Sequence, residues 1–164
     1  MIVEEKLAEL MGLPEITEAR ALDYYLKEVK GEVKDIFGRQ ILLGDEVFDS
    51  LFKDPFTGKK IKEPGNFENS RAKRLPWIRY VLSTSKQVYV VNEPDWITYY
   101  YTMPFQLKYR KENTGDFETA IDHYLIVTKK KAGEKIKFIT AYVPENRLDL
   151  FKKICRGAPY CYEP

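Results

Sequence analysis

The sequence predicts an α+β fold, with a mostly antiparallel sheet of about four strands, helices packed on one face and the other face left open. Two observations predict it. Segments with helical periodicity come first along the chain, and segments with strand character then follow one another, an order typical of α+β rather than alternating folds. Tyr, Val, Ile, Thr and Trp dominate the later segments, and these residue types suit a half-buried pleated surface.

The first 33 residues form an acidic helical extension in this interpretation. Helices are expected over residues 3–11 and 15–31, the second opened by Pro14 and stopped by Gly31. This segment holds eight acidic and four basic side chains, so the remainder of the chain, whose total formal charge is +2, is basic. We therefore expect two units, an extension over residues 1–33 and an α+β domain over residues 34–164.

The body is expected to begin with a short strand and two helices. A helix over about 70–84 would bury the stripe Leu75, Ile78 and Leu82. Alternation in the last strand places Phe138, Thr140 and Tyr142 on one face, and Gly133 supplies the positive φ of the hairpin before it. In chain order the expected elements are strand 40–43, helix 46–52, helix 70–84, strands 87–93, 96–105, 120–130 and 136–143, and helix 145–155.

Composition excludes several classes of protein. No apolar run approaches the roughly 20 residues that span a bilayer, and the acidic N-terminus does not have the order of a secretory signal, so we expect a cytoplasmic protein. The chain has one histidine and two cysteines, Cys155 and Cys161, too few for a zinc site. We expect free thiols, or a local disulfide under oxidation, and no metal or cofactor.

Basic and aromatic residues suggest a site for phosphodiesters. Arg71, Lys73 and Arg74 gather at a predicted helix start, where unpaired N–H groups already attract phosphate, and guanidinium groups match phosphate oxygens. Tyr101 belongs to a run of tyrosines that could stack on unpaired bases. The alternatives are a solvated basic face and a tyrosine packed in the core.

His123, Thr140 and Tyr142 complete the candidate site. The histidine could act as general acid or base at the ribose 2′-hydroxyl, with Glu93 or a basic residue as its partner. The hydroxyls of Thr140 and Tyr142 could donate to a phosphate oxygen. The alternatives are a structural histidine and a threonine bonded only to backbone.

The order of four motifs resembles the phage-associated branch of the barnase–EndoU–colicin–RelE-like nuclease superfamily. The motifs are "FGRQILLGDEVF", "RAKRLPWIRYVLSTSKQVYVV", "FITAYV" and "FKKICRGAPYCY", and the match extends from Gly38 to Tyr162. The resemblance implies that residues 34–164 are a nuclease-like domain that cleaves RNA without a metal on a four-stranded antiparallel sheet. It also implies Arg74 (or Arg71), Thr140 and Arg156 as site residues.

These expectations lead to two functional hypotheses. The first is an endoribonuclease-like, toxin-like domain of phage or prophage origin, in which Arg74, His123, Thr140 and Arg156 are catalytic and Arg71, Lys73, Tyr101 and Tyr142 bind substrate. The alternative is a catalytically silent module that binds RNA or protein during phage assembly. The expected partners are single-stranded or tRNA-like RNA and an immunity or phage structural protein, with no membrane.

Overall fold

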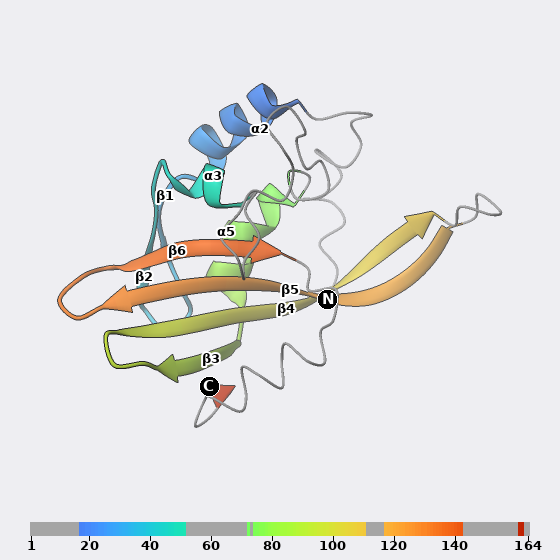
Figure 1. The fold of residues 1–164 in the computed structure, drawn as a ribbon. Coiled ribbons are helices and arrows are strands. Elements are labelled where there is room, and N and C mark those ends of the chain that lie inside the picture. The colour runs from blue at the N-terminus through green and yellow to red at the C-terminus, as the bar shows by residue number, and fades with distance from the viewer. Residues whose placement is uncertain (1–16, 52–71, 73, 111–116, 143–160, 163–164) are drawn as a thin grey trace.

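The computed structural model describes residues 17–51, 72, 74–110, 117–142 and 161–162, and it has an α+β fold (Figure 1). Most of the described chain belongs to one sheet and to the helices beside it. The elements in chain order are the helix α2 (Glu18–Tyr24) and the π-helical turn η1 (Tyr25–Val29), the strands β1 (Gly31–Lys34) and β2 (Gln40–Leu43), the helices α3 (Val47–Ser50) and α5 (Leu75–Thr84), and the strands β3 (Gln87–Asn92), β4 (Trp96–Arg110), β5 (Phe117–Lys131), β6 (Ile136–Tyr142) and β7 (Cys161–Tyr162).

The sheet is larger than the four antiparallel strands that the sequence predicts. Strands β3 to β6, which are those four, pair antiparallel with their neighbours along the chain. Three further strands join them in the described residues, giving the order β1-β2-β6-β5-β4-β3-β7. Strand β2 runs parallel to β6, so the sheet is mixed. This parallel pairing joins segments far apart in the sequence, and local residue patterns do not encode it.

Several predicted elements are confirmed at or near their expected bounds. Strand Gln40–Leu43 is present as predicted, and Gly133 has a positive φ of 76° in the β5–β6 hairpin. The helix predicted over 70–84 is Leu75–Thr84 and has proline in its first turn, where the missing N–H costs no hydrogen bond. The helices predicted over 3–11 and 145–155 lie outside the described residues.

The described part of the N-terminal segment packs into the body of the fold. Ala21, Tyr25 and Val29 belong to the same buried cluster as the sheet residues, and strand β1 runs across the predicted boundary between residues 33 and 34. The guanidinium of Arg79 in α5 donates to the carbonyl oxygens of Val29 at 2.8 Å and Glu32 at 2.9 Å. Residues 17–33 are therefore integral to the fold.

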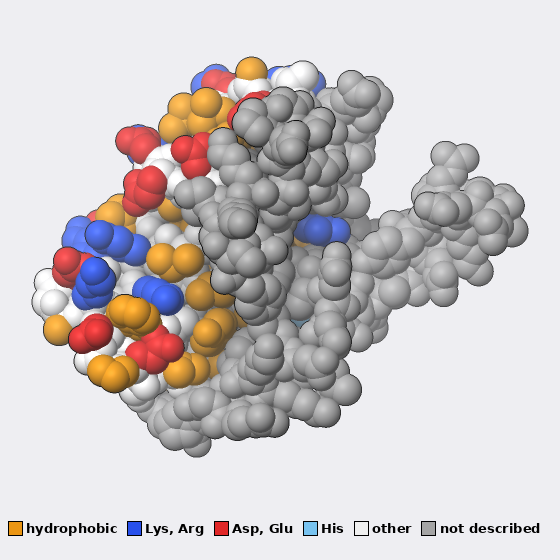
Figure 2. Space-filling model, viewed as in Figure 1, with side chains coloured by type: hydrophobic (Ala, Val, Ile, Leu, Met, Phe, Trp, Pro, Cys, Tyr) orange, Lys and Arg blue, Asp and Glu red, His pale blue; other side chains and the backbone are white. Residues whose placement is uncertain are grey.

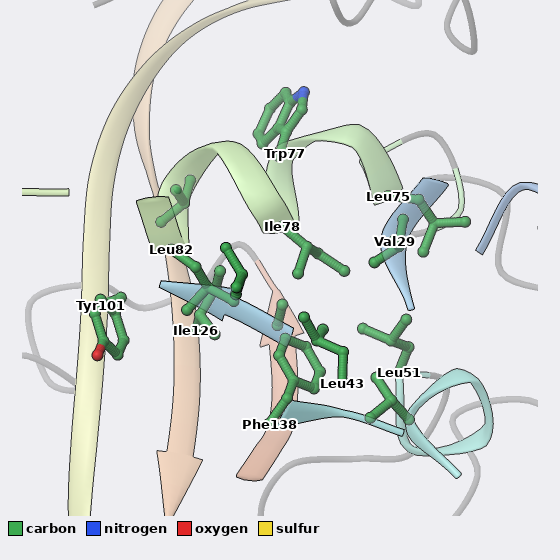
Figure 3. Packing of buried hydrophobic residues seen from close by; sticks show 14 of the residues in the cluster. Val29, Leu43, Leu51, Leu75, Trp77, Ile78, Leu82, Tyr101, Ile126 and Phe138 are labelled. Atoms are coloured by element: carbon green, nitrogen blue, oxygen red, sulfur yellow. The ribbon is translucent and has the colours of Figure 1, made fainter. Parts of the chain in front are cut away.

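The main core lies between the sheet and α5, on the face that we call the helix side. Leu75, Ile78 and Leu82 are buried there as predicted, together with Trp77 (Figure 3). The Trp77 indole stacks on Phe105 of β4, with ring centroids 4.1 Å apart and planes 12° apart. Aromatic stacking of this kind adds to the free energy of burying the rings, so α5 is fixed against the middle of β4.

A β-bulge in β6 overturns the predicted alternation of its side chains. Thr128 of β5 pairs with Phe138 and Val127 pairs with Thr140, so Ile139 is an extra residue between two paired positions. An inserted residue reverses the faces of all residues that follow it. Phe138 therefore points to the helix side, whereas Thr140 belongs to the opposite face.

The strands β4 and β5 form a long hairpin. Each has 15 residues, and they pair with each other along their whole length. Their paired ends, towards Arg110 and Phe117, project beyond the other strands (Figure 1). Among the helices of the described residues, none has the length and apolar character needed to cross a membrane.

Candidate functional site

Four of the predicted site residues cannot be placed as side chains. Arg71, Lys73 and Arg156 lie outside the described residues. Tyr142 is the last residue of β6, opposite Leu125 of β5, but its side chain also lies outside the described part. The remaining four, Arg74, Tyr101, His123 and Thr140, can be located.

Arg74 and Tyr101 lie on the helix side. Arg74 immediately precedes α5, and its guanidinium carbon lies 5.7 Å from the centre of the Trp77 ring. Tyr101 is fully buried, and its hydroxyl donates to the carboxylate of Asp35 at 2.7 Å. Its ring has no exposed face on which a nucleobase could stack.

The Asp35 carboxylate organises a buried polar cluster at the β1–β2 turn. Its two oxygens accept from the backbone N–H of Phe37 at 2.9 Å, from the backbone N–H and Nε of Arg39 at 2.8 and 2.7 Å, and from Tyr101. Burial, followed by this hydrogen bond, raises the pKa of Tyr101 far above its ordinary value. The cluster ties the β1–β2 hairpin to β4, so its role is structural.

The opposite face of strands β3 to β6, which we call the outer face, has a different character. The register and the alternation of side chains define its members, and Figure 2 views the molecule from this side, with α5 behind the strands. They include four aromatic or aliphatic residues that pack together and three lysines, and the carboxylate of Glu93, which directly follows β3, lies near enough to act on Tyr100 of this face. Its described members are Gln87, Tyr89, Val91, Trp96, Thr98, Tyr100, Thr102, Pro104, His123, Leu125, Val127, Lys129, Lys131, Lys137 and Thr140.

Two tyrosines occupy the middle of the outer face. Tyr89 of β3 and Tyr100 of β4 are directly opposite each other in the antiparallel register. Both are partly exposed and pack against the fully buried Leu125. Burial, and to a lesser extent the nearby charge of Glu93, raise the pKa of Tyr100. Its phenol therefore stays neutral at physiological pH and keeps a proton to donate.

Two lysines face each other one register step away. Lys129 of β5 and Lys137 of β6 are directly opposite, and the Lys129 ammonium lies 4.4 Å from the centre of the Trp96 ring. In the described part of the chain neither ammonium forms an ion pair, whereas Lys27 pairs with Asp23 at 3.1 Å. Like charges directly opposite on a sheet face repel and lower stability.

His123 and Thr140 also belong to the outer face, but they lie apart on it. Thr140 is opposite Val127, which is four residues along β5 from His123, a separation of about 13 Å along the strand. The hydroxyls of Thr140 and Thr102 are both buried and have no hydrogen-bond partner among the described residues. The structure thus brings His123 and Thr140 to one face and places Arg74 and Tyr101 on the other.

Sequence reasoning assigned the wrong tyrosine to the exposed surface. In the run Tyr99–Tyr100–Tyr101, alternation places Tyr100 on the opposite face from its two neighbours. Alternation does not show which of the two faces the helices cover. The strand β3 contained a further signal: Val88 and Val90 pair with Tyr101 and Tyr99, and a valine-lined face is typical of a core.

Among the described residues, no three His, Cys, Asp or Glu side chains lie close enough together to hold a metal ion. Comparison with protein-family models, with curated proteins and with solved structures found no match to this chain. The resemblance to a nuclease superfamily therefore remains a prediction from motif order.

Proposed function

We propose that this chain is an RNA-binding domain that holds RNA on the outer face of its sheet. The observation that carries the proposal is the pair Lys129 and Lys137, directly opposite each other on the outer face, where neither ammonium forms an ion pair within the described part of the chain. Opposed ammonium groups repel each other. The phosphates of a bound polyanion neutralise both charges, and the counterions that the polyanion releases on binding add to the affinity. Phosphate contacts by such lysines give affinity without sequence preference.

Salt dependence of RNA binding tests this proposal. Fluorescence anisotropy with a labelled single-stranded RNA, measured from about 50 to 200 mM salt, gives the slope of log Kd against log salt. We expect Lys137→Ala to weaken binding and to reduce that slope by about 0.7, the value for one phosphate contact on a single strand. Lys27→Ala is the control, because Lys27 is an exposed lysine on η1 with its own carboxylate partner.

A slope that is the same in both variants and in the wild type would contradict the proposal. Absence of any RNA binding at low salt would do so as well, because electrostatic binding is strongest there.

Metal-independent ribonuclease activity is the second candidate function, favoured by the presence of His123 and Thr140 on the outer face. In this mechanism the imidazole moves a proton at the 2′-hydroxyl and the threonine hydroxyl donates to the phosphate. Both groups must come within hydrogen-bond reach of one phosphodiester, and their separation of about 13 Å along the strand does not allow that without a third group. Binding therefore ranks first.

Incubation of RNA with the protein in EDTA distinguishes the two functions. The binding function predicts intact RNA. The ribonuclease function predicts cleavage products and a loss on the order of 100-fold in His123→Ala, with Arg74→Ala unaffected because it lies on the other face.

A further inference from the structure

We infer that Lys129, Lys131 and Lys137 form a binding site for the terminal phosphate monoester of an RNA strand, so that the outer face prefers the end of a strand to its interior. This inference rests on the proposed RNA-binding function and specifies which part of the RNA the lysines bind.

The three lysines lie together on the outer face, at the end of the sheet where β5 turns into β6. Lys129 and Lys137 are directly opposite each other, which places their Cβ atoms about 5 Å apart. Lys131 is two residues further along β5 on the same face, about 7 Å from Lys129. Figure 2 shows basic side chains, in blue, gathered at this end of the sheet. Because each ammonium group sits on a long, flexible stem, groups at these spacings can contact one phosphate.

These ammonium groups are accessible to a ligand. Lys131 and Lys137 are exposed, and none of the three lysines forms an ion pair within the described part of the chain. Lys129 is half-buried, and its ammonium group lies 4.4 Å from the centre of the Trp96 ring. This cation–π contact restricts the Lys129 side chain before a ligand arrives, so less conformational entropy is lost when an anion binds.

Three carboxylates border the lysines and confine their positive charge. Glu93 and Asp95 lie between β3 and β4, and Glu134 lies in the turn between β5 and β6. Both connections are at the same end of the sheet, because Trp96 at the start of β4 pairs with Lys131 at the end of β5. A phosphate chain that continued past the lysines over either turn would meet these negative charges and be repelled. A chain that ends at the lysines avoids them.

The charge of a phosphate monoester suits a cluster of this kind. A monoester carries about −1.5 to −2 charges at neutral pH, whereas each internal phosphodiester carries one negative charge. One extra unit charge about 4 Å from an ammonium group changes the affinity about fivefold, even in surroundings as polar as water. Several ammonium groups around one phosphate therefore favour the terminal group over an internal one.

The test uses unlabelled RNA strands that compete with one labelled strand for the wild-type chain. We expect a short strand with a 5′-phosphate to bind at least about fivefold more tightly than the same strand with a 5′-methyl phosphate, which has one charge fewer at that position. A 5′-hydroxyl strand that is two nucleotides longer has about the same total charge as the 5′-phosphate strand, and it should also bind more weakly. Strands with a 3′-phosphate show which end the site takes, and a preference at either end supports the inference. Equal affinity of all strands of equal total charge would overturn it.

Substitutions locate the effect. Lys129→Gln and Lys137→Gln keep much of the stem but remove the charge, and each should lower the preference for the phosphate end about fivefold. Lys130→Gln is the matched control: it removes the same charge from the same hairpin, but Lys130 pairs with Ile97 and so belongs to the helix side. The control should leave the preference unchanged. An equal reduction in all three variants would contradict the inference, because the position of the charge would then not matter.

Failure of the inference and failure of the proposed function give different results. If Lys137→Ala weakens RNA binding and reduces the salt slope while no strand end is preferred, the terminal-phosphate site is excluded and the electrostatic RNA site stands. If no RNA binds at low salt, both are excluded.

Discussion

On the helix side of the sheet the buried carboxylate of Asp35 accepts four hydrogen bonds, whereas on the outer face the buried hydroxyls of Thr102 and Thr140 have none among the described residues. A buried polar group without a partner costs about 1–3 kcal/mol. A buried group without a partner also occurs on the helix side, at Nε1 of Trp77, so what distinguishes the outer face within the described residues is its pair of opposed lysines. Such departures are expected at functional surfaces, and this contrast is why we assign binding to the outer face.

The largest loss of stability should come from removing the Asp35 carboxylate, which accepts four hydrogen bonds. Asp35→Ala leaves Tyr101 and two backbone N–H groups without their acceptor and Arg39 without its buried partner. We expect the free energy of unfolding to fall by about 3 kcal/mol, measured by urea denaturation. Asp23→Ala, which breaks an exposed ion pair, should cost less than about 1 kcal/mol. Equal losses in the two variants would show that the cluster does not stabilise the fold.

Alkaline pH should lower the free energy of unfolding through the buried phenol of Tyr101 on the helix side. The pKa of Tyr101 lies far above the ordinary value of 10.0, so the unfolded chain releases this proton as pH rises past about 10 while the folded chain retains it. Stability is therefore fully present below that pH and falls above it, by up to about 1.4 kcal/mol per pH unit for one such group.

Tyr101→Phe removes this contribution. Urea denaturation at about pH 9 and about pH 11, on either side of the ordinary tyrosine pKa, should show a smaller loss of stability in the variant than in the wild type. Identical losses would mean that the buried phenol does not titrate on unfolding in this range.

The smallest expected change is a gain in the free energy of unfolding, from a substitution on the outer face. Thr140→Val replaces an unpartnered buried hydroxyl by a methyl group of similar volume, and we expect the free energy of unfolding to rise by about 1 kcal/mol. Thr128→Val is the matched control: this threonine is also buried in the sheet, but its hydroxyl donates to the carbonyl oxygen of Tyr99 at 3.2 Å. The control should lose stability. A loss in both variants would remove the contrast between satisfied and unsatisfied hydroxyls.

Local sequence signals predicted the elements but not all of their partners. The bounds of Gln40–Leu43, the buried stripe of α5 and the turn at Gly133 follow from composition and periodicity within a few residues. The parallel contact of β2 with β6 is set by packing between segments nearly 100 residues apart, for which one sequence holds no local signal.

The candidate site was predicted only in part. Residue chemistry identified His123 and Thr140, which share the outer face, but it joined them to Arg74 and Tyr101, which lie on the helix side. Basic and aromatic residues look alike in a sequence whether they are exposed or buried. Tyr100, Lys129 and Lys137 become recognisable as a set only when the register of three strands is known.

The bulge at Ile139 determines which side chains of β6 face the helix side and which face outward. Up to Phe138 the strand's large apolar groups enter the hydrocarbon layer beneath α5, and after the extra residue a methyl, that of Ala141, takes their place. If Ile139 were instead paired opposite Val127, without the bulge, the hydroxyl of Thr140 would turn into that layer and Ala141 out of it. One extra residue thus decides whether the hydroxyl of Thr140 lies on the outer face of the sheet or in the core beneath α5.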